Sequence, residues 1–191
     1  SMIDQTVDEI ADMQTHSSSV VAVKAARALG ELTDREFPAV EEYLRALERN
    51  SNALRRANPS HASLHNTQAR VVKRVTGEDH DSVAAAQRLT ETAIDAVVET
   101  VEEGKQRAAE HGADLLADDD TLLVHDYSTT VLSAVTRAAE AGASFTVYVT
   151  EARPRYLGRK MARRLAEFEA VDTHLLVDSA SGHYLSECDR V

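Results

Sequence analysis

The stretch TLLVHDYSTTVLSAVTRAAEAGASFTVYVT, residues 121–150, decides the fold of the second half of the chain. It opens with a short apolar run at 121–125 and closes with a β-branched and aromatic run at 145–150. Between them, residues 129–141 have the periodicity of a helix that ends at Gly142. Short apolar runs are typical of strands buried on both faces of a parallel sheet. The stretch therefore predicts strand, helix, strand with a right-handed crossover.

The same alternation continues toward the end of the chain. Residues 158–168 predict an arginine-rich helix, residues 173–177 a third strand, and the segment after Ser179 a short helix. A fourth strand would begin only at residues 189–191. Three strands are few for such a sheet. The fold class is therefore α/β, with a Rossmann-like parallel sheet that we expect to be incomplete at the carboxyl terminus and to belong to a fragment or a reduced version of a longer protein.

The first half has helical periodicity and almost no strand signal. Helices are predicted over 20–32, from Pro38 through Leu47, from about Ser60 or Ser63 to Gly77, and over 82–111, where Gly104 interrupts the pattern. Apolar residues recur there every three or four positions. We expect two domains: an all-helical N-terminal domain at 1–112 and a Rossmann-like domain with the first three strands at 113–191.

Composition narrows the class of protein. The 191 residues include 32 acidic and 21 basic residues, a net charge of −11, and only four of the basic residues are lysines. This balance resembles the proteins of salt-adapted archaea, and it argues against direct binding of nucleic acid. No apolar run is long enough to cross a membrane and no secretory signal is recognisable, so we expect a cytoplasmic protein. A single cysteine, Cys188, excludes an internal disulfide.

Polar residues follow each predicted strand. Ligands of open parallel sheets bind beyond the carboxyl ends of the strands. The candidate ligand-binding residues at these ends are His125, Asp126, Tyr127, Ser128, Glu151, Arg153, Asp178 and Ser179. An alternative stays open for Ser128 and Asp178, which can simply cap the helices that follow them.

Several common sites are missing from the sequence. There is no glycine-rich dinucleotide or phosphate loop, so no cofactor is predicted. His61 and His65 are four residues apart but lack the carboxylate of a metalloprotease pattern, and we expect a solvated or locally hydrogen-bonded pair and no metal. Glu187 and Asp189 flank Cys188 and should raise the pKa of its thiol, which argues against a nucleophile.

Four phrases give the chain a resemblance to a known family. They are LRRANPSHASLHN at 54–66, VTEARP at 149–154, LGRKMA at 157–162 and VDSASGHY at 177–184. The chain resembles the alpha, beta and delta regulatory subunits of translation initiation factor 2B, whose superfamily includes ribose-1,5-bisphosphate isomerase and methylthioribose-1-phosphate isomerase. The resemblance implies a helical domain joined to a Rossmann-like domain, with a cleft of sugar-phosphate size between them.

The chain departs from the isomerase pattern at the implied ligand site. Where the isomerases have an Arg-Gly-Ala segment, this chain has His16, Ser17 and Ser18, and where they have Arg-Pro it has Asn58 before proline. Losing arginines at two phosphate positions removes strong bidentate contacts. These four residues are nevertheless candidates for ligand binding.

The implied catalytic groups also differ. Asp126 stands where the isomerases have their catalytic cysteine, and Leu157 replaces a glutamine. Their catalytic aspartate lies in a Gly-Ala-Asp phrase that would follow Val191. Aldose-to-ketose isomerisation needs a proton donor and acceptor beside the sugar carbons. No catalytic residue is therefore assigned, and Asp126 is only named as the residue at the cysteine position.

These departures favour a non-catalytic, regulatory-subunit-like protein. It would bind a translation initiation factor as partner, or a phosphorylated metabolite such as a nucleotide monophosphate or a sugar phosphate. It would form a homo-oligomer, because an incomplete sheet leaves an exposed strand edge. The alternative is a sugar-phosphate isomerase of the ribose-1,5-bisphosphate type. Turnover of a ribose bisphosphate that depends on Asp126 would favour the alternative, and a ligand-induced rise in melting temperature without turnover the first hypothesis.

Overall fold

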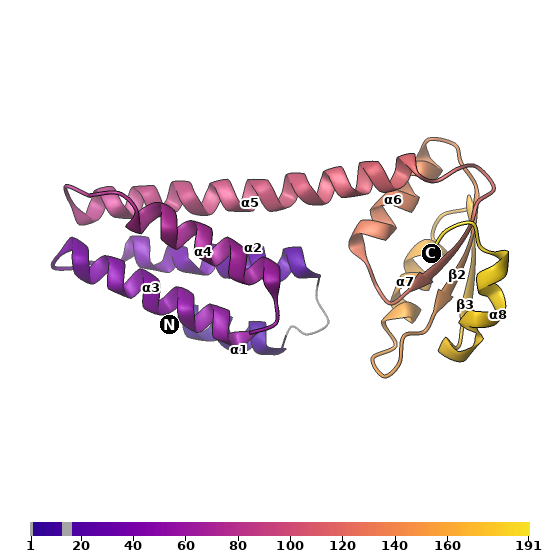
Figure 1. The fold of residues 1–191 in the computed structure, drawn as a ribbon, viewed down its shortest axis with the longest axis horizontal. Helices are drawn as coiled ribbons and strands as arrows, with labels where there is room; N and C mark the ends of the chain where they lie inside the picture. The colour runs from indigo at the N-terminus through magenta and orange to yellow at the C-terminus, as the bar shows by residue number, and fades with distance from the viewer. Residues whose placement is uncertain (1, 13–16) are drawn as a thin grey trace. The chain divides into compact units, whose positions relative to one another are not determined.

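The protein, described by a computed structural model, consists of two compact units, residues 1–104 and residues 105–191 (Figure 1). The structure describes residues 2–12 and 17–191. Each unit is considered by itself below. Along the chain, the boundary between the units follows Gly104, which lies inside one long helix. The sequence placed the boundary at the end of that helix, and the assignment of domains at 1–112 and 113–191 stays a prediction.

Unit 1 is built from helices. They are α1 (Met2–Asp12), α2 (Ser18–Ala28), the 3-10 helix η1 (Leu29–Asp34), α3 (Val40–Ala57), α4 (Ala62–Thr76) and the first part of α5 (Val83–Asp114). Their apolar faces meet in one core that includes Leu47, Leu54, Leu64 and Val71. Tyr43 of α3 is also buried there, and its hydroxyl lies 2.6 Å from Oγ1 of Thr90 in α5.

Two local predictions about these helices were wrong. Pro38 was expected in the first turn of the second helix, but α3 begins at Val40 with Ala39 as its N-cap. Gly104 was expected to interrupt the long helix, but α5 runs without a break through it to Asp114. No helix in the part of the chain that the structure describes is both long and apolar enough to span a bilayer.

Unit 2 contains a three-stranded parallel sheet. Its strands are β1 (Thr121–His125), β2 (Phe145–Thr150) and β3 (Val171–Leu176), in the order β1-β2-β3. The connections are α6 (Thr129–Glu140) and α7 (Leu157–Leu165), which cover one face of the sheet (Figure 1). The third strand begins at Val171, two residues earlier than predicted. The predicted α/β class, a helical part followed by a Rossmann-like parallel sheet, is confirmed.

The two faces of the sheet are covered differently. Val147 and Val149 of β2 pack with Val135 of α6 and Met161 of α7 in the core of unit 2. The opposite face is covered by a short segment after β3, made of η2 (Asp178–Ala180), α8 (Ser181–Tyr184) and η3 (Leu185–Glu187). Its Tyr184 ring stacks on Tyr148 of β2 with centroids 4.6 Å apart.

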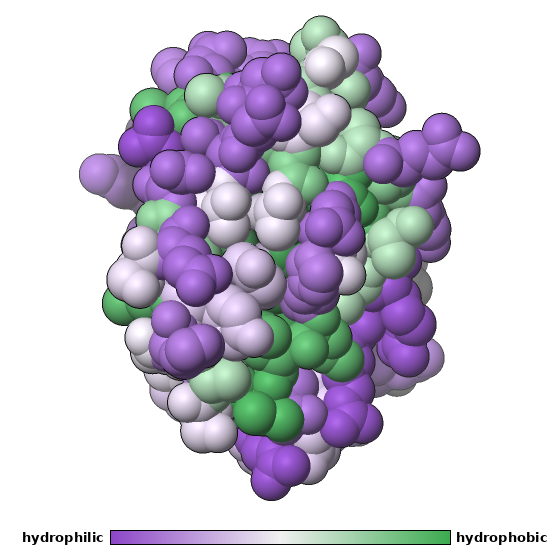
Figure 2. All heavy atoms as spheres, turned by 90° about the vertical axis from the view of Figure 1, so that its right-hand side faces the viewer, coloured by the Kyte–Doolittle hydropathy of each residue, from purple (hydrophilic) through white to green (hydrophobic). Residues whose placement is uncertain are grey.

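The edges of the sheet differ as well. Beyond β1, Arg190 forms an isolated parallel bridge with Leu122, and its carbonyl accepts a hydrogen bond from the Leu123 N–H at 2.9 Å. This is the place where the sequence predicted the start of a fourth strand. Figure 2 shows the face of unit 2 that carries α8, where hydrophilic residues surround a smaller hydrophobic area. Leu175 and Val177, in and just after β3, are half-exposed.

Candidate functional site

The carboxyl end of β1 presents a histidine and an aspartate to solvent. Nδ1 of His125 lies 2.6 Å from Oγ1 of the buried Thr150, the last residue of β2. Asp126 follows with a φ of 68°, and its carboxylate accepts a hydrogen bond from the Tyr127 N–H at 2.7 Å. Aspartate is one of the few side chains that adopt this left-handed conformation readily. The sheet end therefore fixes an exposed carboxylate next to an exposed imidazole.

The carboxyl end of β2 carries a buried carboxylate that is paired with two exposed arginines. Glu151 is 5% exposed. Its two oxygens accept hydrogen bonds from Nε of Arg153 at 2.8 Å and from Nη2 of Arg159 at 3.0 Å. The hydrogen bonds from Arg153 and Arg159 lower the pKa of Glu151, so this carboxyl stays ionised.

Asp178, after β3, organises the link that follows β2. Its carboxylate accepts hydrogen bonds from the N–H groups of Ala152 and Arg153, both at 2.8 Å. The bond from the Arg153 N–H is the main reason that the pKa of Asp178 is lowered, and the bond from the Ala152 N–H contributes as well. Ala152 has a φ of 58°. Asp178 thus binds the backbone of a neighbouring strand end and does not cap η2, whose N-cap is Val177.

The start of α7 lies close to the carboxyl end of β2, and two of its side chains contact tyrosine rings. A Cβ atom on Gly158 would overlap the carbonyl of Thr150, so only glycine allows this approach of α7 to the end of β2. The Arg159 guanidinium carbon lies 4.2 Å from the centroid of the Tyr156 ring. Lys160 Nζ lies 4.5 Å from the Tyr127 centroid, so α7 also contacts the link after β1.

The structure therefore brings the predicted residues of the three strand ends to one edge of unit 2. Ser128 accepts a hydrogen bond from the Val131 N–H at 3.2 Å and caps α6, as the alternative proposed. Ser179 is exposed in η2. Sequence reasoning missed Thr150 and Arg159; Arg159 lay in the quoted LGRKMA phrase, which was the available signal.

The remaining predicted residues belong to the first half of the chain. His16 lies outside the described residues. Ser17 is the N-cap residue of α2 without a side-chain capping bond, and Ser18 is the exposed first residue of that helix. Asn58 ends α3, and its carbonyl lies 3.3 Å from Nε2 of His65.

In the described part of the chain, the histidine pair and Cys188 do not have the surroundings of a metal site or of an activated thiol. The histidine pair is locally hydrogen-bonded, since Nδ1 of His61 accepts a bond from the Leu64 N–H at 3.0 Å. Across residues 2–12 and 17–191, no three His, Cys, Asp or Glu side chains are grouped as metal ligands. Burial, followed by the charges of Glu187 and Asp189, raises the pKa of Cys188, in the predicted direction.

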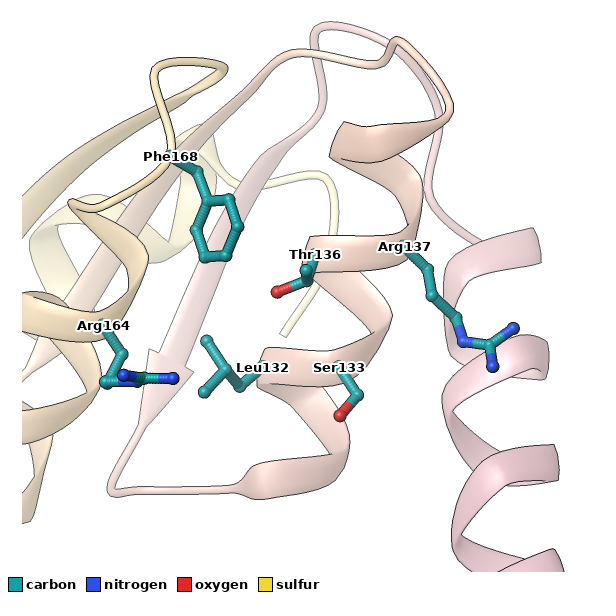
Figure 3. A pocket seen from close by; sticks show the side chains of 6 residues that line it. All are labelled: Leu132, Ser133, Thr136, Arg137, Arg164 and Phe168. Atoms are coloured by element: carbon teal, nitrogen blue, oxygen red, sulfur yellow. The ribbon is translucent and has the colours of Figure 1, made fainter.

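A cavity of ≈ 320 Å³ lies between α6 and α7, away from the strand ends (Figure 3). Phe168, Leu132 and Arg164 face one another across it. Arg137 also lines it, and its guanidinium group extends toward α5, where it pairs with Glu110 at 3.3 Å. Because it is lined by the last turn of α7 and the middle of α6, this cavity is separate from the site at the strand ends.

Comparison with known proteins identifies the family. The sequence model described as "Initiation factor 2 subunit family" matches residues 14–191, almost the whole chain. The chain belongs to the Initiation factor 2 subunit family. The predicted resemblance is confirmed, because this family and its isomerase relatives form one superfamily.

Individual relatives are similar to this chain over nearly all of its length. "Ribose 1,5-bisphosphate isomerase" of Haloterrigena turkmenica is 32% identical over 190 residues, which cover 97% of this chain and 56% of the relative. The solved Pyrococcus horikoshii OT3 translation initiation factor eIF-2B is 25% identical with a TM-score of 0.82, over 97% of this chain and 63% of that one. The chain thus spans a little over half the length of the curated relatives it matches.

A third structure shares the fold. The tetrameric eIF2B-beta2-delta2 complex from C. thermophilum is 18% identical with a TM-score of 0.77, over 98% of this chain and 63% of that one. At this identity the similarity supports the fold alone.

The comparisons correct the functional prediction. Five archaeal relatives, 28–32% identical over nearly the full chain, carry the name ribose 1,5-bisphosphate isomerase. The prediction of a non-catalytic, regulatory-subunit-like protein was therefore wrong, and the alternative named beside it is favoured. The error came from treating each replaced side chain as a lost function, although a carboxylate can move a proton as a thiol can.

Proposed function

We propose that this protein is a sugar-phosphate isomerase whose substrate is ribose 1,5-bisphosphate, and that the strand ends of unit 2 form part of its active site. The five archaeal relatives of that name carry the proposal. The structure supports it, because an exposed carboxylate, an imidazole and two guanidinium groups gather at the edge where parallel sheets bind ligands.

The chemistry requires two protons to move. Removal of the C2 proton supplies the electron pair of a C1–C2 double bond while the ring C1–O bond breaks and the ring oxygen is protonated. Protonation of C1 and loss of the C2 hydroxyl proton then leave a ketone at C2. Each step needs a positioned acid or base. Asp126 and His125 are the candidates, since one Asp126 oxygen is held by the Tyr127 N–H and the other can accept a proton.

Replacing Asp126 tests this role. The protein is incubated with ribose 1,5-bisphosphate in D2O, and NMR follows both exchange of the C2 proton and formation of the ketose. We expect D126N to slow exchange by roughly a hundredfold or more, the usual contribution of a general base.

The chain offers a matched control in Asp119. Like Asp126 it is exposed and adopts a positive φ, 64°, but it precedes β1 instead of following it. Asparagine tolerates this conformation at both positions, so D119N should exchange the C2 proton at the rate of the original protein. Equal rates for D126N and D119N, or no exchange and no conversion by the original protein, would refute the proposal.

We also propose that the enzyme is a homo-oligomer in which a partner chain covers the edge of β3. Within the described residues β3 has a strand on one side only, and Leu175 and Val177 are half-exposed there. Exposed strand edges of this kind invite pairing. Small-angle scattering should give a dimer or a larger assembly, and L175K should shift it toward the monomer. A monodisperse monomer would contradict this assembly.

A further inference from the structure

Glu151 has an unusual position for a carboxylate. It is almost fully buried, and it directly follows the last residue of β2. Each of its oxygens binds a different arginine, Arg153 two residues later and Arg159 in the first turn of α7. Buried carboxylates are rarely retained unless they are paired and hydrogen-bonded. Here one carboxylate holds two guanidinium groups, so the three side chains together keep one positive charge.

The two arginines remain open to a ligand. Arg153 is 63% exposed and Arg159 is 51% exposed, although Glu151 between them is buried. Both guanidinium groups lie over the Tyr156 ring, with their central carbons 5.5 Å and 4.2 Å from its centroid. The aromatic face and the carboxylate therefore restrict both side chains while leaving N–H groups directed to solvent.

The other charged groups of this edge are mostly engaged. The carboxylate of Asp178 is bound by two backbone N–H groups. One oxygen of Asp126 is bound by a third N–H group. Lys160 adds a positive charge above the Tyr127 ring. An anion approaching this edge thus meets two pre-oriented guanidinium groups.

We propose that Glu151 is a positioning residue that holds Arg153 and Arg159 as a paired-guanidinium site for one phosphoryl group of the substrate. Arginine forks match the geometry of phosphate oxygens, and two of them in fixed orientation bind a dianion more strongly than two mobile side chains. The inference rests on the proposed function, because it assigns one phosphate of the bisphosphate to this end of β2.

Calorimetric titration with inorganic phosphate at constant ionic strength tests the site without any reaction. R153A and R159A should each weaken phosphate binding roughly tenfold or more, as expected for a charged hydrogen-bonding partner. R159K keeps the positive charge but loses the planar guanidinium group with its paired N–H donors, and it should weaken phosphate binding severalfold. R163A is the matched control, since Arg163 is exposed one helical turn beyond Arg159, and it should leave the affinity unchanged.

The direction in which E151Q changes the affinity for phosphate distinguishes a positioning role of Glu151 from a purely electrostatic one. Removing a negative charge beside an anion site strengthens binding if charge alone matters. If Glu151 positions the arginines, E151Q weakens phosphate binding about threefold or more instead, as is reasonable for the loss of pre-organised donors. E167Q is the control, because Glu167 pairs with exposed Arg164 at 3.5 Å at the other end of α7, and it should leave binding unchanged.

The outcomes also separate this inference from the isomerase proposal. Circular dichroism at the titration temperature confirms that each variant is folded. If E151Q is unfolded, the affinity of R159K for phosphate tests the paired-guanidinium site instead. Unchanged or tighter phosphate binding by E151Q, or unchanged binding by R159A and R159K, would overturn the inference even if the sugar is isomerised. Phosphate binding with the expected pattern, but no conversion of ribose 1,5-bisphosphate, would refute the isomerase and leave the site standing.

Discussion

Replacing Gly158 by alanine tests the contact that brings α7 to the end of β2. The added Cβ would overlap the Thr150 carbonyl oxygen and would lie 2.8 Å from its carbon and 3.0 Å from the Glu151 carbonyl carbon. All three atoms belong to the backbone, so no side chain can swing away. Overpacking of this kind costs about 1–3 kcal/mol. The hydrogen bond from the Gly158 N–H to the Glu151 carbonyl, 3.2 Å long, is disrupted as well and adds about 1 kcal/mol.

We therefore expect G158A to lower the free energy of unfolding of unit 2 by about 2–4 kcal/mol. For a domain of this size each kcal/mol lowers the melting temperature by roughly 4–8 °C, so a loss of 2–4 kcal/mol lowers it by about 8–32 °C if the unit melts by itself. Thermal unfolding followed by circular dichroism measures the change.

The control is G104A, because a Cβ on Gly104 meets no atom within 4 Å. Alanine is the better helix former, so G104A should stabilise α5 by up to about 1 kcal/mol. A G158A protein that melts within a degree or two of the original would show that α7 does not approach the sheet this closely.

Three further predictions concern stability. Gln68 is fully buried, and neither polar atom of its side chain has a hydrogen-bond partner among the described residues, so Q68M should raise the free energy of unfolding by about 1–2 kcal/mol in urea titrations. The control Q87M should lower the free energy of unfolding, because the Gln87 amide donates to two backbone carbonyls at 3.1 Å and 2.7 Å. Burial lowers the pKa of His61, so the unfolded chain binds the proton more readily than the folded protein. The free energy of unfolding should therefore fall as pH drops below about 6.5. H61N should remove this dependence on pH, and an unchanged dependence would contradict the assignment to His61. Because the pKa values of Glu151 and Asp178 are lowered, both carboxylates stabilise the folded protein above their ordinary pKa values of 4.5 and 3.8, and this stabilisation is lost as pH falls further. In urea titrations between about pH 5 and 2, E151Q should reduce the decrease in the free energy of unfolding with falling pH. A decrease as steep as in the original protein would argue against the ion pair.

The first two strands were predictable because they are short apolar and β-branched runs whose residues are mostly buried. Residues 121–125 and 145–150 are too short for a helix and do not repeat apolar residues every three or four positions, and both strands have the predicted bounds. The third strand was harder, since Val171 and Asp172 extend it into a polar segment that only pairing with Phe145 and Thr146 defines.

Helix boundaries depended on effects that the sequence does not display. Proline fits the first turn of a helix, but α3 starts after Pro38 because Ala39 is held in an extended conformation. A glycine in a helix costs only about 1 kcal/mol when exposed, and the packing of the rest of α5 outweighs that cost at Gly104.

The site was predictable in place but not in detail. The rule for parallel sheets located His125, Asp126, Glu151, Arg153 and Asp178 at one edge. It could not show that Asp178 binds the backbone after β2, because that bond depends on the left-handed turn at Ala152. Arg159 was missed for a related reason: its bond to Glu151 requires α7 to begin directly beside β2.

The arrangement of charges bears on how Asp126 could work. A substrate with two phosphates is repelled by any carboxylate whose charge is not compensated nearby. Glu151 and Asp178 are compensated by arginines and by backbone N–H groups, so their charges serve to build the site. Asp126 receives a single N–H bond and remains exposed, so its charge is the one that a bound phosphate would feel most. Glu151, Arg153 and Arg159 together keep one positive charge at this edge, which offsets part of the repulsion between the Asp126 carboxylate and the bisphosphate, as a base at this position requires.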